Sequence, residues 1–150
     1  MRVLVVDDEP LARARLTALL AECSDVEVVD RVGDGEAALV AIGETQPDVV
    51  LLDISMPAMD GVALAQRLAT RGRPQVIFCT AYESHALEAF ELGAADYLLK
   101  PVRLERLREA LARAARRLAD APAAPVVYLH GRLRGEQVRI ALDAVICLLA

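Results

Sequence analysis

The sequence contains no tryptophan, and aromatic residues make up only 3% of its 150 positions. The core must therefore be built from alanine and aliphatic side chains, because hydrophobic residues still account for 55% of the chain. This composition is typical of helices packed on a buried parallel sheet. The net charge of −5 argues against a basic surface that holds nucleic acid.

Cysteine pairs and long apolar runs are also lacking. Cys23, Cys79 and Cys147 are widely spaced and form no Cys-x-x-Cys motif, which predicts free thiols rather than disulfides or a metal site. The first apolar run, residues 3–6, is ended by three acids and is too short for a signal sequence or a membrane span. These features predict a cytoplasmic protein with no membrane contact.

Short runs of valine, isoleucine and leucine alternate with segments of helical period. The expected strands cover residues 3–6, 26–29, 49–52, 76–79 and 97–99. This alternation predicts β-α-β units around a parallel sheet. Five such units form a doubly wound, flavodoxin-like α/β fold with strand order 2-1-3-4-5. We expect Pro10, Asp34 and Asp60 at the starts of the first three helices.

The pattern changes once these five units are complete. We expect a first domain over residues 1–120 and a stiff, proline-containing linker over residues 121–125. The remainder, residues 126–150, has a β-rich pattern with strands expected over 126–129 and 138–149. It is interpreted as the incomplete start of a second domain.

Acidic side chains follow two strands that are expected to be neighbours. Asp7 and Asp8 come directly after the first strand, and Asp53 comes directly after the third. The carboxyl ends of parallel strands share one edge, so the three acids are predicted to form one pocket. Crowded carboxylates repel one another unless a cation compensates, and Mg²⁺ prefers oxygen ligands. The alternative is that these acids only cap helices, where negative charge is favourable.

Two further residues favour chemistry over capping. Thr80 follows the fourth strand and Lys100 follows the fifth, so both are expected at the same edge. Lys100 is the only lysine among 17 lysine and arginine residues, which suggests that a slim, mobile cation is needed there. A hydroxyl, an ammonium, a metal and a carboxylate together make a phosphoryl-transfer site. Asp53 is then the nucleophile that forms an aspartyl phosphate.

Four short motifs occur along residues 2–118. They are VVDDEP at 5–10, LDISMPAMDG at 52–61, TA at 80–81 and YLLKP at 97–101. In combination they resemble the receiver domain of two-component response regulators. The resemblance implies that Asp53 accepts a phosphoryl group from a sensor histidine kinase. It also implies a switch that catalyses only its own phosphotransfer and dephosphorylation, rather than an enzyme with a separate substrate.

The resemblance also implies a metal site. Asp8, Asp53 and the backbone carbonyl of Ser55 would ligate Mg²⁺, and Asp7 would help through water. Two other phosphate-handling classes fit less well. A phosphatase with an aspartyl intermediate usually has a second aspartate two residues after the nucleophile, where this chain has Ser55. A nucleotide- or flavin-binding module would have a glycine-rich first loop in place of these acids.

Further roles implied by the resemblance concern the switch itself. Thr80 and Lys100 would contact the phosphoryl oxygens, and the peptide between Lys100 and Pro101 would be cis. Phosphorylation would draw Thr80 inward, and Tyr97 would turn from a solvent-facing to a buried rotamer. This movement would alter the face made by the fourth helix, fifth strand and fifth helix, which is also a candidate homodimer surface.

Two segments indicate the output. Residues 80–92 resemble the branch of receivers that carries a LytTR-type DNA-binding domain. Residues 138–150 are similar to the opening strands of that domain, except that Cys147 stands where an aromatic is usual. The resemblance implies a transcription regulator that binds DNA through a domain of which only the start is present. A receiver that acts as a phosphate sink or protein-docking module, without DNA output, is the alternative.

Overall fold

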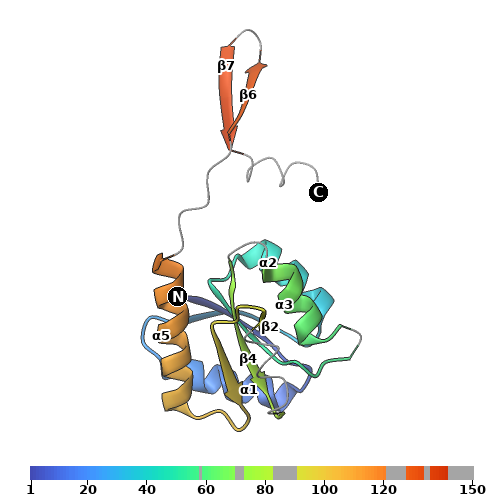
Figure 1. Cartoon of the computed structure of the whole chain (residues 1–150), viewed down its shortest axis with the longest axis vertical. Coiled ribbons are helices and arrows are strands. Elements are labelled where there is room, and N and C mark those ends of the chain that lie inside the picture. Colours follow the sequence, from blue (N-terminus) through green and yellow to red (C-terminus); the bar gives the residue numbers. More distant parts are fainter. Residues whose placement is uncertain (58, 70–72, 83–90, 121–127, 134–135, 142–150) are drawn as a thin grey trace.

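Five parallel strands form the centre of the fold (Figure 1). The computed structural model describes residues 1–57, 59–69, 73–82, 91–120, 128–133 and 136–141. The strands are β1 (Arg2–Val6), β2 (Glu27–Val32), β3 (Val49–Leu52), β4 (Gln75–Thr80) and β5 (Asp96–Leu99). They lie in the order β2-β1-β3-β4-β5, which confirms the flavodoxin-like topology predicted from the sequence.

Helices cover both faces of this sheet. The described helices are α1 (Pro10–Ala21), α2 (Gly35–Thr45), α3 (Gly61–Ala69) and α5 (Leu104–Asp120). One apolar cluster joins α1 and α5 to one face, and a second cluster joins α2 and α3 to the other. Most of the helix expected between β4 and β5 falls on residues 83–90, which lie outside the described residues.

Strand β1 shows how the sequence builds this sandwich. Val3 and Val5 belong to the cluster with α1 and α5, whereas Leu4 and Val6 belong to the cluster with α2 and α3. Successive side chains of a strand point to opposite faces, so a strand covered on both sides needs an uninterrupted apolar run. All four of these residues are fully buried, as expected for an interior strand that is covered on both faces.

The three expected helix starts are confirmed. Pro10 is the first residue of α1, where its missing N–H costs no hydrogen bond. The Asp34 side chain accepts a hydrogen bond of 2.7 Å from the Ala37 N–H at the start of α2. The Asp60 side chain accepts a bond of the same length from the Ala63 N–H at the start of α3. Side-chain oxygens at these positions satisfy backbone donors that have no partner within the helix.

Strand β2 is longer than its apolar run. The sequence predicts a strand over residues 26–29, whereas the structure extends it to Val32 through the exposed residues Asp30 and Arg31. β2 is the edge of the sheet beside β1, so some of its side chains can face solvent. The apolar pattern therefore underestimates the length of this strand.

A separate antiparallel pair follows α5 in the sequence. It consists of β6 (Tyr128–Leu133) and β7 (Glu136–Ala141). Two strands were expected in this region, although the first continues beyond residue 129. Residues 121–127 and 142–150 lie outside the described residues, so the expected linker and the end of the second strand remain predictions.

The described part of the chain contains Cys23 and Cys79. Cys23 and Cys79 are free, and burial raises the pKa of the Cys79 thiol, which keeps it protonated. Cys147 lies outside the described residues. Within those residues, no helix combines the length and the apolar character needed to cross a membrane.

Candidate functional site

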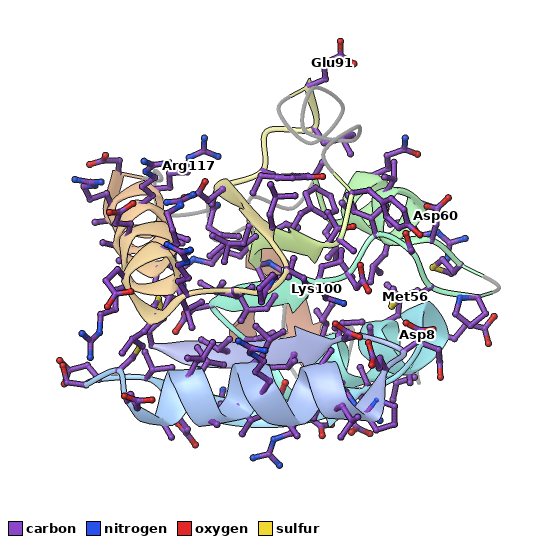
Figure 2. The ribbon with its side chains drawn as sticks, turned by 90° about the horizontal axis from the view of Figure 1, so that it is seen from below. Asp8, Met56, Asp60, Glu91, Lys100 and Arg117 are labelled. Atoms are coloured by element: carbon purple, nitrogen blue, oxygen red, sulfur yellow. The ribbon has the colours of Figure 1, made fainter. Side chains whose placement is uncertain are left out.

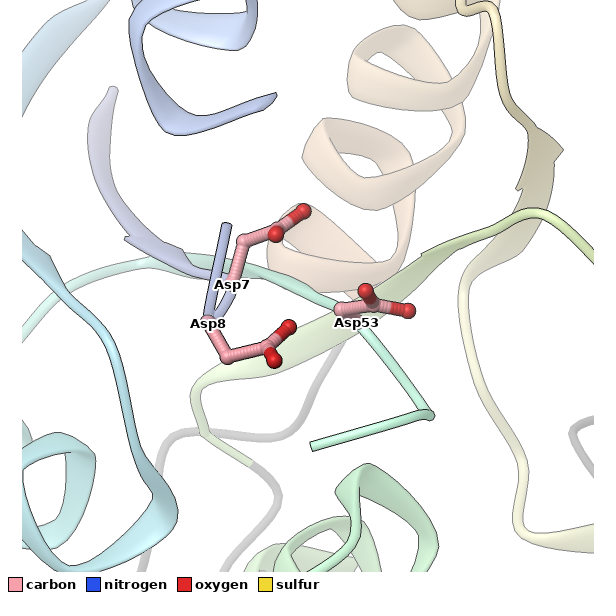
Figure 3. A group of neighbouring side chains, drawn as sticks. All are labelled: Asp7, Asp8 and Asp53. Carbon is pink, nitrogen blue, oxygen red and sulfur yellow. The ribbon is translucent and has the colours of Figure 1, made fainter. Parts of the chain in front are cut away.

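Three carboxylates meet at the carboxyl edge of the sheet (Figure 3). Asp7 and Asp8 follow β1, and Asp53 follows β3, whose last residue pairs with the last residue of β1. One ligand oxygen of each acid lies within 4.8 Å of those of the other two. Asp7 and Asp53 are buried, whereas Asp8 is exposed. The three acids predicted from strand order to lie together therefore do so, and Asp8 is the exposed member of the group.

Lys100 reaches this cluster from the end of β5. Its Nζ lies 2.8 Å from Asp53 Oδ2 and 2.7 Å from Asp7 Oδ2. Figure 2 shows Lys100 and Asp8 in the same part of the molecule, with Arg117 well away from both on α5. Burial alone would lower the pKa of Lys100, but its contacts with Asp53 and Asp7 outweigh burial and raise it. The side chain is thus a firm ammonium ion between two carboxylates.

Asp7 carries an electrostatic penalty in this site. Burial raises the pKa of its carboxyl group and outweighs the lowering by Lys100 and by the Glu9 N–H, while the charge of Asp53 raises it further. Oδ2 lies 2.7 Å from Lys100 Nζ and forms an ion pair with it. Among the described residues Oδ2 has no hydrogen-bond partner besides this ion pair. A buried carboxylate oxygen of this kind fits a hard divalent cation.

The loop after β3 is packed tightly against α3. The Asp53 N–H donates to the Val6 carbonyl at 2.8 Å, and the Ser55 N–H donates to Asp53 Oδ1 at 3.3 Å. Gly61, the first residue of α3, donates its N–H to the Ile54 carbonyl at 2.8 Å. A Cβ on Gly61 would lie 2.1 Å from the Asp53 carbonyl oxygen. The motif over residues 52–61 contains this glycine, but its contact with the Asp53 backbone was not predicted.

Thr80 lies at the end of β4 and is fully buried. Its Oγ1 accepts a hydrogen bond of 3.3 Å from the Tyr82 N–H, and its carbonyl accepts one of 2.8 Å from the Lys100 N–H. The Tyr82 carbonyl in turn accepts a hydrogen bond from the Tyr97 hydroxyl. Thr80 and Tyr97 are therefore joined through the backbone of Tyr82, a link that the sequence did not reveal.

Tyr97 is half-buried in β5 and packs beside the cluster that includes α2 and α3. The peptide that joins Lys100 to Pro101 is cis, as the resemblance implies. The expected site residues are thus placed at one edge, on β1, β3, β4 and β5 and the loops that follow them. The arrangement combines the buried carboxylate of Asp53, the ammonium of Lys100, the hydroxyl of Thr80 at the same edge and the exposed carboxylate of Asp8.

A family model for the response regulator receiver domain matches residues 3–112. The chain belongs to this family. The receiver domain accounts for the sheet and for the strand-end acids that the sequence and the structure bring together. No family match is needed to see the acidic site, but the match identifies the protein as a component of two-component signalling.

The receiver is similar to curated regulators. It is 52% identical over 118 residues to the "Positive alginate biosynthesis regulatory protein" of Pseudomonas aeruginosa. This alignment covers 77% of this chain and 48% of that protein. It is 43% identical over 113 residues to the "Transcriptional regulatory protein BtsR" of Escherichia coli K12, covering 75% of this chain and 47% of that protein. The chain thus spans about half the length of these relatives.

A solved receiver structure supports the same fold. The response regulatory domain of protein mrkE from Klebsiella pneumoniae superimposes with a TM-score of 0.73 at 37% sequence identity. The match covers 81% of this chain and 100% of that domain. The receiver fold observed here is therefore shared across the whole of that solved domain.

Proposed function

We propose that this receiver accepts a phosphoryl group on Asp53 from a sensor histidine kinase in the cytoplasm. The observation that supports this most directly is the position of Asp53, with its Oδ2 2.8 Å from the only lysine of the chain and its carboxylate beside two further acids. A carboxylate of this kind is a nucleophile whose product charge can be neutralised in place.

Asp7, Asp8, Asp53 and the Ser55 carbonyl would hold Mg²⁺ at this edge. The buried Oδ2 of Asp7 and the grouping of the three carboxylates support this assignment. When bound, the metal neutralises charge on the phosphoryl oxygens. Asp8, as the exposed member, leaves the site open to the incoming donor.

The transfer itself requires one bond to form and one to break. A carboxylate oxygen of Asp53 attacks the phosphorus, and the P–N bond of the kinase phosphohistidine breaks, so that no oxidant or reductant is needed. The Lys100 ammonium, already in contact with Asp53, lies within reach of a phosphoryl oxygen attached there. It would remain an electrostatic partner of the group before and after transfer.

Thr80 and Tyr97 are proposed to read the phosphorylated state. Three strong acceptor oxygens on Asp53 would attract the Thr80 hydroxyl. Because the Tyr82 N–H bonds that hydroxyl oxygen and the Tyr82 carbonyl accepts from Tyr97, a shift of Thr80 would change the position of the Tyr97 ring. A small change in charge would thereby bias a two-state element at β5.

The output is proposed to be DNA binding by a LytTR-type domain, of which residues 126–150 are the start. The similarity to a transcriptional regulator supports this proposal. The face formed by the helix between β4 and β5, β5 and α5 would serve as a homodimer surface, although most of that helix lies outside the described residues. Retention of genomic DNA fragments by the protein with its complete output region, with and without beryllofluoride, tests this output. If beryllofluoride does not change DNA retention, the alternative of a phosphate sink or protein-docking module is favoured.

The phosphoacceptor is tested with Asp53→Asn and acetyl phosphate as donor. We expect the wild-type chain to take up acid-labile phosphate in the presence of Mg²⁺ and the variant to take up none. Asp60→Asn is the matched control, because Asp60 is an exposed helix cap outside the carboxylate cluster. Persistent labelling of Asp53→Asn at the wild-type level would refute the assignment.

A further inference from the structure

Arg13, on α1, contacts the loop that carries two of the three acids. Its Nη1 donates a hydrogen bond of 2.5 Å to the carbonyl oxygen of Asp7. That carbonyl belongs to the peptide that joins Asp7 to Asp8. A single hydrogen bond from a charged donor thus holds the backbone unit from which both carboxylates project.

The loop after β2 leaves room for this guanidinium. A Cβ on Gly33 would lie 3.2 Å from Arg13 Nη1, closer than most such contacts allow. The N–H of Asp7 meanwhile donates to the carbonyl of Val32 at 3.1 Å. The Asp7 backbone is therefore held on its N–H by the end of β2 and on its carbonyl by Arg13.

The turn of α1 that carries Arg13 is itself fixed to β2. The Thr17 hydroxyl donates to the Arg13 carbonyl at 2.8 Å and accepts a bond of 3.0 Å from Arg31 Nε. Arg31 is in β2, so these bonds link the edge strand, the helix and the acidic loop in one connected set. The backbone of Arg13 is thereby held by two elements, α1 and β2, that do not themselves carry the acids.

We propose that Arg13 is a positioning residue for the divalent-cation site, holding the Asp7–Asp8 peptide so that both side chains face Asp53. This inference rests on the Mg²⁺ site of the proposed function. Position and charge have opposite consequences here. Arg13 is a cation and, by charge alone, repels Mg²⁺, so its removal would tighten binding. If Arg13 positions the ligands, its removal weakens binding.

The test compares Mg²⁺ affinity in Arg13→Gln and Arg15→Gln with that of the wild-type chain. Both variants remove one positive charge from α1, but Arg15 is exposed and takes no part in the described bonds to the acidic loop. Affinity is measured from amide chemical shifts during a Mg²⁺ titration, without any phosphoryl donor. We expect Arg13→Gln to weaken binding by about tenfold, the effect typical of residues that orient metal ligands. We expect Arg15→Gln to leave it unchanged or slightly tighter.

Gly33→Ala provides a second perturbation that changes no charge. Its Cβ should displace the guanidinium and weaken Mg²⁺ binding less than Arg13→Gln does. In the Arg13→Gln background the same alanine should have no further effect, because the group that it displaces is gone. Arg13→Lys, which keeps the charge but has one donor group, should give an intermediate affinity.

Several results would overturn the proposal. One is that Arg13→Gln binds Mg²⁺ as tightly as the wild-type chain or more tightly. Another is that Gly33→Ala still weakens Mg²⁺ binding in the Arg13→Gln background. If Arg13→Gln does not fold, Gly33→Ala and Arg13→Lys must each bind Mg²⁺ more weakly than wild type for the proposal to stand. A wild-type chain that shows no Mg²⁺-dependent shifts would instead refute the cation site itself, so the two failures are distinguished by the wild-type titration.

Discussion

Two clusters of charged side chains in this receiver, one around Asp96 and one around Asp7 and Asp53, have opposite surroundings. Asp96, at the start of β5, has a side chain that is 8% exposed and lies 3.3 Å from Arg106 and 3.1 Å from Arg113. Arg106 also pairs with Glu109 at 2.8 Å. This cluster on β5 and α5 therefore balances two cations with two anions. Its charges are satisfied by residues of the chain alone.

The strand-end site is not balanced in this way. Lys100 is the only described cation in contact with the carboxylates of Asp7 and Asp53, and Asp8 adds a third negative charge. The two regions resemble each other in burial and in distances but differ in their sum of charges. A balanced cluster anchors α5 to β5, whereas the unbalanced one is compatible with a further cation. Charge balance thus separates the structural anchor from the functional site.

Removal of Lys100 should have the largest effect on stability, because it increases the charge imbalance of the strand-end site. Lys100→Met leaves Asp7 and Asp53 without their shared cation, and we expect the free energy of unfolding to fall by about 3 kcal/mol without Mg²⁺. Added Mg²⁺ should restore much of this loss, because it replaces the missing positive charge. Chemical denaturation with and without Mg²⁺ measures both values. Equal losses in the two conditions would contradict the charge imbalance.

Gly61→Ala tests the backbone support that only the strand-end site has. The added Cβ would overlap the Asp53 carbonyl oxygen, so the loop or α3 must move. We expect a loss of about 2 kcal/mol in unfolding free energy and a reduced rate of phosphorylation by acetyl phosphate. Gly43→Ala is the control, because a Cβ there meets no atom within 4 Å. A fully active Gly61→Ala would show that Asp53 does not depend on this packing.

Asp96→Asn should have a smaller effect and no dependence on metal. The two arginines that it leaves behind are 41% and 50% exposed, so water can solvate them. We expect a loss of about 1 kcal/mol, the same with and without Mg²⁺. The denaturation midpoints of the variant in the two conditions provide the measurement. A loss that Mg²⁺ reverses would mean that the two clusters are not independent.

Asp7→Asn should raise the free energy of unfolding, whereas the three preceding substitutions should lower it. Because burial raises the pKa of Asp7 above its ordinary value of 3.8, its contribution to stability is complete below pH 3.8. That contribution is lost as pH rises through the folded-state pKa. The variant has no charge to bury, so we expect it to gain about 1 kcal/mol over wild type at neutral pH without Mg²⁺.

This gain should shrink as the pH is lowered toward 3.8, where Asp7 is protonated in the wild-type protein. Thermal unfolding of both proteins across this pH interval, with Mg²⁺ absent, follows the difference directly. A difference that does not change with pH would show that Asp7 does not bear the electrostatic penalty inferred here.

The sequence was most informative where the position along the backbone determines the result. Asp53, Thr80 and Lys100 were expected at one edge because each follows an apolar run that predicts a strand, and the carboxyl ends of parallel strands share one edge. Lys100, Asp53 and Asp7 follow β5, β3 and β1, which are not adjacent strands, so their contact also depends on the length of the lysine side chain. A site built on strand ends is therefore largely readable from periodicity.

Contacts made by long side chains were not readable in this way. Arg13 reaches the Asp7 carbonyl only because Gly33, distant in sequence, leaves space for it. Arg113 and Asp96 are 17 residues apart, and nothing in their spacing indicates a pair. Arginine has many rotamers, and its partner depends on how helices lie on the sheet. The extension of β2 beyond residue 29 was missed for a related reason, because an edge strand tolerates polar residues.

Because Lys100 is the single lysine of the sequence, the site can be labelled chemically at one known position. Reductive methylation with ¹³C-formaldehyde would label only this side chain and the N-terminal amine, since the sequence has no second lysine. The N-terminal amine donates to the Asp25 carbonyl in a different part of the fold, so the two labels would give distinct NMR resonances. Methylation would thus place an isotopic reporter beside Asp7 and Asp53, and its resonance would register a metal ion or a phosphoryl group bound there without any engineered substitution.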